Sequence, residues 1–144
     1  RILRKMKKPK LYHKILIGIS LLAFVFHLMI MLKIIPYAVT WGGRLKTDEE
    51  MYTFESLSVL INLFFIYIVL QKGAFVKAIF SDKALNLTLW IFFVLFSLNT
   101  IGNIVAKTLF EKIFTIITLL NAILIWKINT SSRVIKSAGL KDKE

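Results

Sequence analysis

Two ionisable residues, His27 and Glu55, stand inside long apolar segments made mostly of Leu, Ile and Phe. An imidazole and a carboxylate can exchange a proton, or can bind a polar or cationic ligand. Both groups are costly to keep in hydrocarbon, so such residues usually face a bundle interior or a wet cavity and often mark a pathway or a pocket. This pair is therefore the first candidate for a functional site.

Amide residues extend this candidate site. Asn62 follows Glu55 by seven residues, which places both on one face of a helix. Asn99 and Asn103 share a face of a later segment, and two neighbouring amides need several hydrogen-bond partners. At about 1.5 Å of rise per residue, Glu55 would lie roughly 6 Å and His27 roughly 12 Å below the outer membrane boundary. These five residues together predict an outward-facing polar pocket for a small polar or amphiphilic ligand.

Residues 36–45 could gate the mouth of this pocket. The segment contains Trp41, whose indole suits a membrane interface, and the pair Gly42 and Gly43, which permits a sharp turn. Arg44 adds a cation beside that turn. We expect the segment to fold back over the bundle mouth, with Trp41 and Arg44 in contact with the ligand.

A further polar face lies in the last apolar segment, where Glu111, Thr115 and Thr118 align with Asn121 beside them. Hydroxyl and amide groups of this kind commonly join neighbouring membrane helices, each hydrogen bond contributing about 0.6 to 2 kcal/mol. We interpret Thr115, Thr118 and Asn121 as such helix-to-helix contacts.

Four apolar segments are long enough to carry these residues across a bilayer, because a helix needs about 20 mostly apolar residues to cross the hydrocarbon core. Hydrophobic residues make up 57% of the 144-residue chain, more than the core of a soluble protein of this size could hide. Pro36 is expected to end the first segment, and Thr47 with Glu50 forms a capping-box pattern before the second. The predicted fold class is an all-α integral membrane protein, a single membrane domain of residues 1–144 whose four-transmembrane-helix bundle spans residues 15–35, 51–70, 85–105 and 109–126.

Basic residues predict the orientation of this bundle, because cytoplasmic loops carry an excess of Lys and Arg. Fifteen of the 20 Lys and Arg residues fall in the amino-terminal arm (residues 1–14), the second connection or the tail (residues 127–144), and five fall on the opposite side. We therefore expect both termini in the cytoplasm, N-in/C-in, and we expect the protein in a bacterial inner (plasma) membrane.

The charge pattern also predicts partners. Seven Lys and Arg residues precede the first span, and each one near the surface can contribute about 1 kcal/mol of attraction to the anionic headgroups of membrane lipids. The net charge of +12 does not indicate a nucleic-acid partner, because the basic residues lie between apolar segments and not on the face of a soluble domain. The sequence is also compatible with a homo-oligomer or with a place in a larger membrane complex.

The residue types restrict the chemistry. Because the 144 residues contain no Cys, they can form neither disulfides nor thiolate metal sites. No nucleophile stands with its base, and no full set of metal ligands or cofactor motif is evident, so we expect no catalytic residue, metal or cofactor.

Three functions are compatible with this pattern. The leading hypothesis is a bundle that binds or transports a ligand through the outward pocket. The first alternative is a membrane-embedded lipid-modifying enzyme that uses His27 and Glu55 as acid and base. The second alternative is a non-catalytic structural or assembly subunit of a membrane complex, in which the polar residues only join helices.

Overall fold

A computed structural model describes the backbone of residues 2–141 and the side chains of residues 10–131. It contains the long helices α1 (Ile2–Met31), α2 (Asp48–Lys72), α3 (Asp82–Ile104) and α4 (Leu109–Lys141), with the short 3-10 helices η1 (Tyr37–Val39) and η2 (Trp41–Gly43) between α1 and α2. Each long helix holds a stretch that is long and apolar enough to cross a membrane, namely Lys10–Met31, Asp48–Lys72, Asp82–Ile104 and Leu109–Ser131. The predicted set of four spanning-length helices is confirmed.

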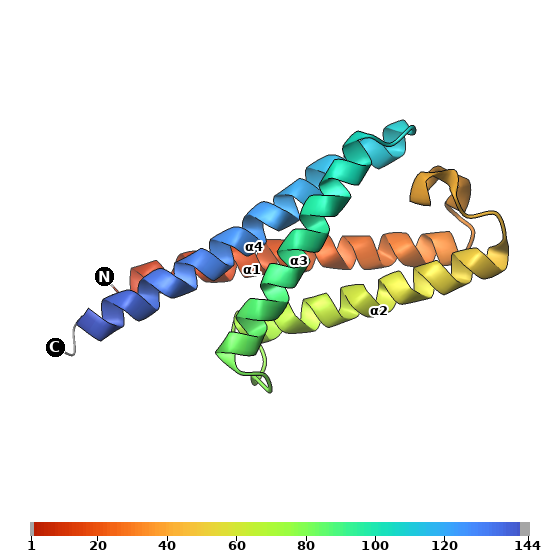
Figure 1. Cartoon of the computed structure of the whole chain (residues 1–144). Helices are drawn as coiled ribbons and strands as arrows, with labels where there is room; N and C mark the ends of the chain where they lie inside the picture. Colours follow the sequence, from red (N-terminus) through yellow and green to blue (C-terminus); the bar gives the residue numbers. More distant parts are fainter. Residues whose placement is uncertain (1, 142–144) are drawn as a thin grey trace.

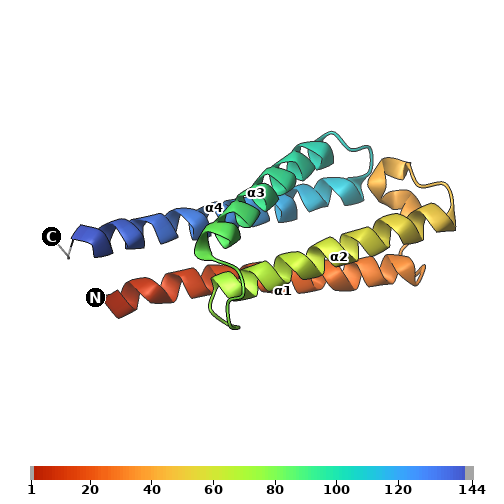
Figure 2. The ribbon, with the colours of Figure 1, turned by 60° about the horizontal axis from the view of Figure 1, so that its bottom comes forward.

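The helices form two antiparallel hairpins. α1 lies along α2 and α3 lies along α4, while α1 also contacts α4 and α2 contacts α3. Figures 1 and 2 show both chain termini at one end of the bundle and the η1–η2 segment at the other, between the two hairpins. We call these the terminus end and the loop end. Two ends on one side agree with the predicted N-in/C-in arrangement, whose sidedness stays a prediction.

The apolar core lies toward the terminus end and draws on all four helices. Its most buried members include Leu16 of α1, Phe65 of α2, Leu89 of α3 and Ile125 of α4. A smaller apolar cluster at the loop end consists of Ile30, Leu45 and Met51. Along α1 and α2, His27 and Glu55 therefore lie between these two apolar clusters.

Large apolar side chains cover the outside of the bundle. Leu22, Leu60, Val105 and Ile116 are 74%, 65%, 76% and 71% exposed. Soluble monomers rarely present contiguous apolar surface of this extent. The surface suits contact with lipid, which supports the assignment as a membrane bundle.

α1 ends at Met31, four residues before the predicted boundary at residue 35. The backbone N–H of Ile34 donates to the carbonyl of Met29 and that of Lys33 to the carbonyl of Ile30, both across 2.9 Å. Lys33 adopts a φ of 60°. These features form a Schellman motif, which satisfies the last helical carbonyls before the following proline is reached.

The starts of α2 and α3 follow side-chain caps. The hydroxyl of Thr47 accepts a hydrogen bond from the backbone N–H of Glu50 across 3.2 Å, and the Glu50 carboxylate accepts one from the backbone N–H of Thr47 across 3.4 Å. Ser81 caps α3 by accepting from the backbone N–H of Ala84. The predicted capping box is confirmed, and α2 begins at Asp48 because of it.

α4 begins at Leu109 as predicted but continues to Lys141, well past the predicted end of the span at residue 126. The predicted polar tail thus starts as a continuation of the helix. The lipid contacts predicted for the amino-terminal arm fall mostly on residues 1–9, whose side chains lie outside the described part of the chain.

Candidate functional site

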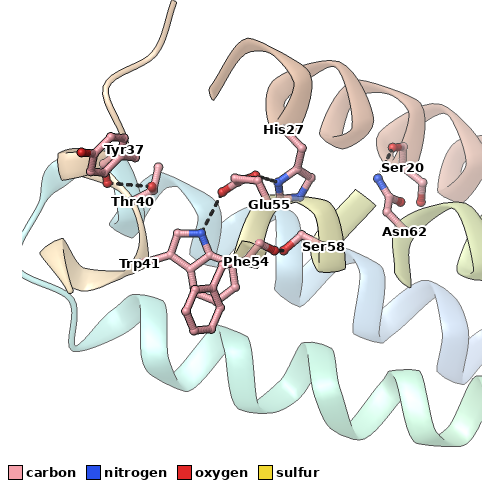
Figure 3. A network of polar contacts seen from close by, with 9 residues as sticks. All are labelled: Ser20, His27, Tyr37, Thr40, Trp41, Phe54, Glu55, Ser58 and Asn62. Atoms are coloured by element: carbon pink, nitrogen blue, oxygen red, sulfur yellow. Dashed lines mark hydrogen bonds and ion pairs between the residues drawn. The ribbon is translucent and has the colours of Figure 1, made fainter. Parts of the chain in front are cut away.

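His27 and Glu55 meet between α1 and α2 in the half of the bundle nearer the loop end. Nδ1 of His27 lies 2.6 Å from Oε2 of Glu55. The side chain of Glu55 is fully buried at 0% exposure, and that of His27 is 22% exposed. Figure 3 shows the two side chains pointing toward one another. The structure therefore brings together the two ionisable residues that the sequence singled out.

The second oxygen of Glu55 is bonded to the segment between α1 and α2. Nε1 of Trp41 donates to Oε1 of Glu55 across 2.8 Å, and the indole packs against the ring of Phe54 with centroids 5.2 Å apart. Both carboxylate oxygens thus have a partner, one from a helix and one from the loop (Figure 3). The expected folding back of this segment is confirmed, and Trp41 contacts Glu55 itself.

A second buried carboxylate holds the same turn from the opposite hairpin. Glu111, 9% exposed near the start of α4, accepts a hydrogen bond from the backbone N–H of Gly42. Its other oxygen accepts from the hydroxyl of Thr108 across 2.7 Å. Gly42 has a φ of +66°, a conformation that residues with a side chain rarely adopt. We call the two contacts Trp41–Glu55 and Gly42–Glu111 the latch, because adjacent loop residues bind one carboxylate from each hairpin.

Sequence reasoning did not include Glu111 among the site residues. Its place on a polar face of the last span was recognisable, and Thr108 three residues earlier has the spacing of a capping box. The contact with Gly42 joins residues 69 positions apart, and no local pattern indicates such a pairing. A carboxylate at a helix start also has a bland explanation, namely the favourable interaction with the helix dipole.

Asn62 joins α1 to α2 at a separate level of the bundle. Its Nδ2 donates to the backbone carbonyl of Ser20 across 3.0 Å, while the hydroxyl of Ser20 donates to the carbonyl of Leu16. Along α2 this contact lies about 10 Å from Glu55. Asn62 therefore faces the interior as predicted. It serves as a helix-to-helix contact that lies nearer the terminus end than the His27–Glu55 pair (Figure 3).

Asn99 does not face this interior, and that part of the prediction is wrong. Its side chain is exposed on α3, whereas Asn103 is half-buried. α3 turns the next residue, Thr100, toward α4, where its hydroxyl donates to the hydroxyl of Thr118 across 2.9 Å. Because neighbouring residues of a helix point about 100° apart, a buried Thr100 rotates Asn99 out of the bundle.

Arg44 and the predicted open pocket also differ from expectation. Arg44 is exposed beyond the turn, and within the described residues it forms no ion pair. A hollow of about 550 Å³ lies on the loop itself and is lined by Lys33, Ile35, Pro36, Tyr37, Ala38, Gly43, Leu45 and Lys46. None of the predicted lining residues borders it. Trp41 closes off Glu55 instead, so the site is shut in this conformation.

The chemistry available at the site is proton exchange and hydrogen bonding. The imidazole and carboxylate are close enough to share a proton, and Oε1 of Glu55 would accept from another donor if Trp41 moved away. Among residues 10–131 no group of three or more His, Asp or Glu is arranged to hold a metal ion. Within the same range His27 is hydrogen-bonded to Glu55 and to no Ser or Thr hydroxyl.

Comparison with protein-family models, with curated proteins and with solved structures finds no match to this chain.

Proposed function

We propose that this protein is a small membrane transporter or binding protein that admits a small polar or amphiphilic ligand from outside the cell. In this proposal the His27–Glu55 pair is the ligand-binding and proton-exchanging site, and the loop that carries Trp41 closes it. The observation that supports it is a carboxylate at 0% exposure with two partners, one of which belongs to a loop.

The energetics of Glu55 favour a functional role. Removing a carboxylate from water costs several kcal/mol even after relaxation, and paired groups recover this only with good geometry. Replacing a buried ion pair by well-packed apolar residues of similar volume is often neutral or stabilising. Keeping Glu55 there indicates a use for its charge or its proton, as intramembrane acids commonly have.

The latch suggests how ligand exchange would occur. Displacement of the Trp41 indole would leave Oε1 of Glu55 without its donor, and a ligand with an N–H or ammonium group would take that place. The same movement would release Gly42 from Glu111 on the other hairpin. Loop opening would therefore uncover the site and loosen the contact between the two hairpins in one step.

This chemistry predicts the ligand class. A cationic amphiphile satisfies the carboxylate and also the rings of Phe26 and Phe54, which pack against its partners His27 and Trp41. An alkylamine is therefore preferred over an alcohol or a carboxylate of the same length. In the membrane the loop end would face outward and both termini inward, as the basic residues predict. A bacterial plasma membrane is the proposed location.

A thermal-shift comparison on purified protein tests the proposal. Octylamine at about ten times its Kd should contribute about 1.4 kcal/mol of stabilisation and raise Tm by roughly 3 to 6 °C, whereas octanol and octanoate should not. Glu55→Gln should abolish the shift. Ser58→Ala is the matched control, because this hydroxyl lies one turn away and donates only to the carbonyl of Phe54. An equal shift in Glu55→Gln would refute the site.

The exposed amide of Asn99 favours one other function, that of an assembly subunit. A polar side chain that faces lipid gains a partner when a second membrane helix covers it. In that case the protein would bind another chain through α3, and the ligand test above would be negative for every amphiphile.

A further inference from the structure

Polar side chains line one face of α4 along nearly its whole span. Beyond Glu111 the line continues through Thr115, Thr118 and Asn121 and reaches Asn129 near the terminus end. With 3.6 residues per turn, these five positions fall within an arc of about 120°. The line is about 27 Å long, close to the roughly 30 Å thickness of a hydrocarbon core.

Three oxygens on this line are buried without a hydrogen-bond donor among the described residues, namely Oγ1 of Thr115, Oδ1 of Asn121 and Oδ1 of Asn129. Asn121 and Asn129 are only 5% and 1% exposed. Thr118, by contrast, is paired with Thr100 of α3 and fits the role of a helix-to-helix contact. Thr115 and Asn121 do not fit that role, since a buried polar group that packing leaves unpaired calls for water, an ion or a ligand.

One apolar stretch interrupts the polar line. Between Asn121 and Asn129, a distance of about 12 Å along the helix, the same face carries Ile125 at 0% exposure. Ile125 belongs to the apolar core together with Leu16 and Phe65. An apolar constriction between two polar segments blocks ions by excluding water, as hydrophobic gates in channels do.

We infer that this face of α4 is a translocation path for a small monovalent cation, entered beside Glu111 and gated by the apolar core at Ile125. Hydroxyl and amide oxygens can replace part of the hydration shell of such an ion and still let it leave. The buried carboxylates of Glu111 and Glu55 at the loop end favour a cation over an anion. The inference goes beyond the proposed amphiphile site and rests on the proposed function only through the latch, because opening the latch frees Glu111 from Gly42.

Water access to the line is the first test, and the absence of native Cys in the 144 residues makes single-Cys labelling direct. Thr115→Cys and Asn121→Cys are compared with Ile116→Cys and Ile123→Cys, which replace exposed side chains on the lipid side of the same helix. The reagent is a membrane-impermeant cationic methanethiosulfonate, applied in a Trp41→Phe background that removes the Trp41–Glu55 half of the latch and keeps the Glu111 carboxylate at the entrance. Labelling at 115 and 121 at least tenfold faster than at 116 and 123 is expected, and equal protection at all four would overturn the path.

Ion flux through the full-length chain in liposomes is the second test. Ile125→Ser should raise K⁺ flux at least tenfold over the unaltered protein by wetting the gate, whereas Ile123→Ser, the same change on the lipid side, should leave flux unchanged. A flux of protons without K⁺ or Na⁺ would overturn the assignment to a monovalent metal ion. Octylamine is absent from this assay, so the path and the binding site can fail separately. An absence of flux together with an intact octylamine shift would reject the path and keep the binding site, whereas K⁺ flux without an octylamine shift would keep the path and reject the binding site.

Discussion

The indole N–H of Trp41 donates to Oε1 of Glu55 across 2.8 Å, while Oε2 of the same carboxylate contacts His27. The buried carboxylate of α2 is thus bonded both to α1, through His27, and to the loop between the two helices, through Trp41 (Figure 3). The hydrogen bond from Trp41 is the part of this arrangement that a loop movement can break, and the first prediction tests it.

Trp41→Phe should open the loop. The change keeps an aromatic ring against Phe54 but leaves one oxygen of the buried carboxylate unpaired, at a cost of about 1.5 to 3 kcal/mol for a hydrogen bond to a charged group. Limited trypsin digestion should cut after Arg44 several times faster than in the unaltered protein. Trp90→Phe is the control, because Trp90 lies on α3 against Phe93. Equal cleavage rates in both variants would mean that the indole does not hold the loop.

Two glycine substitutions should change stability in opposite directions. Gly42→Ala forces a side chain into a φ of +66° and should destabilise the fold by about 1 to 2 kcal/mol. Gly18→Ala, in the middle of α1 with open space at the Cβ position, should stabilise it by up to about 1 kcal/mol. Thermal unfolding in detergent measures both. A neutral Gly42→Ala would show that the turn is not fixed in this conformation.

Asn62 and Asn99 should respond differently to replacement by Leu. Asn62→Leu removes the bond to the carbonyl of Ser20 and should cost about 0.6 to 2 kcal/mol. Asn99→Leu removes an exposed amide from the lipid face and should be neutral or stabilising in a monomer. If Asn99→Leu instead destabilises the protein and lowers its oligomeric mass in detergent, the result supports the assembly function and counts against the ligand proposal.

The ion pair between Lys33 and Asp48 predicts a pH-dependent contribution to stability at the loop end. The hydrogen bond to Asp48, the largest influence, raises the pKa of Lys33 above its ordinary value. Since the folded value is the higher one, the contribution to stability is present below the ordinary lysine pKa and is lost as pH rises through the raised value. Observation of the ¹³Cε signal of Lys33 by NMR should give a pKa that falls in Asp48→Asn. An identical titration in both proteins would show that the contact is absent in solution.

The helices were predictable because their signals are local. Apolar length defines a span, and the capping box at Thr47 and Glu50 defines the start of α2, so both could be read from neighbouring residues. The end of α1 was misplaced because Lys33, with no glycine present, adopts the left-handed conformation that closes the helix. Proline is an obstacle to a helix, but it does not fix the last turn before it.

The site was predictable only in part, for a related reason. The cost of an acid and an imidazole in hydrocarbon identified His27 and Glu55, and a distance of 2.6 Å now joins them. The rotation of α3 about its own axis could not be read from its sequence, since Asn99 and Thr100 are both polar and only packing against α4 decides which one turns inward. Spacing gives the residues that share a face, but not the neighbour that this face meets.

The most direct test of the central claim is the number of protons exchanged when octylamine binds to the purified protein. Isothermal titration in two buffers of different ionisation enthalpy measures that number. An ammonium that replaces the Trp41 contact at Glu55 would compete with the proton shared with His27, so the account predicts one-to-one binding with net proton release, and no binding by Glu55→Gln. Binding by Glu55→Gln with unchanged affinity and the same proton count would contradict it.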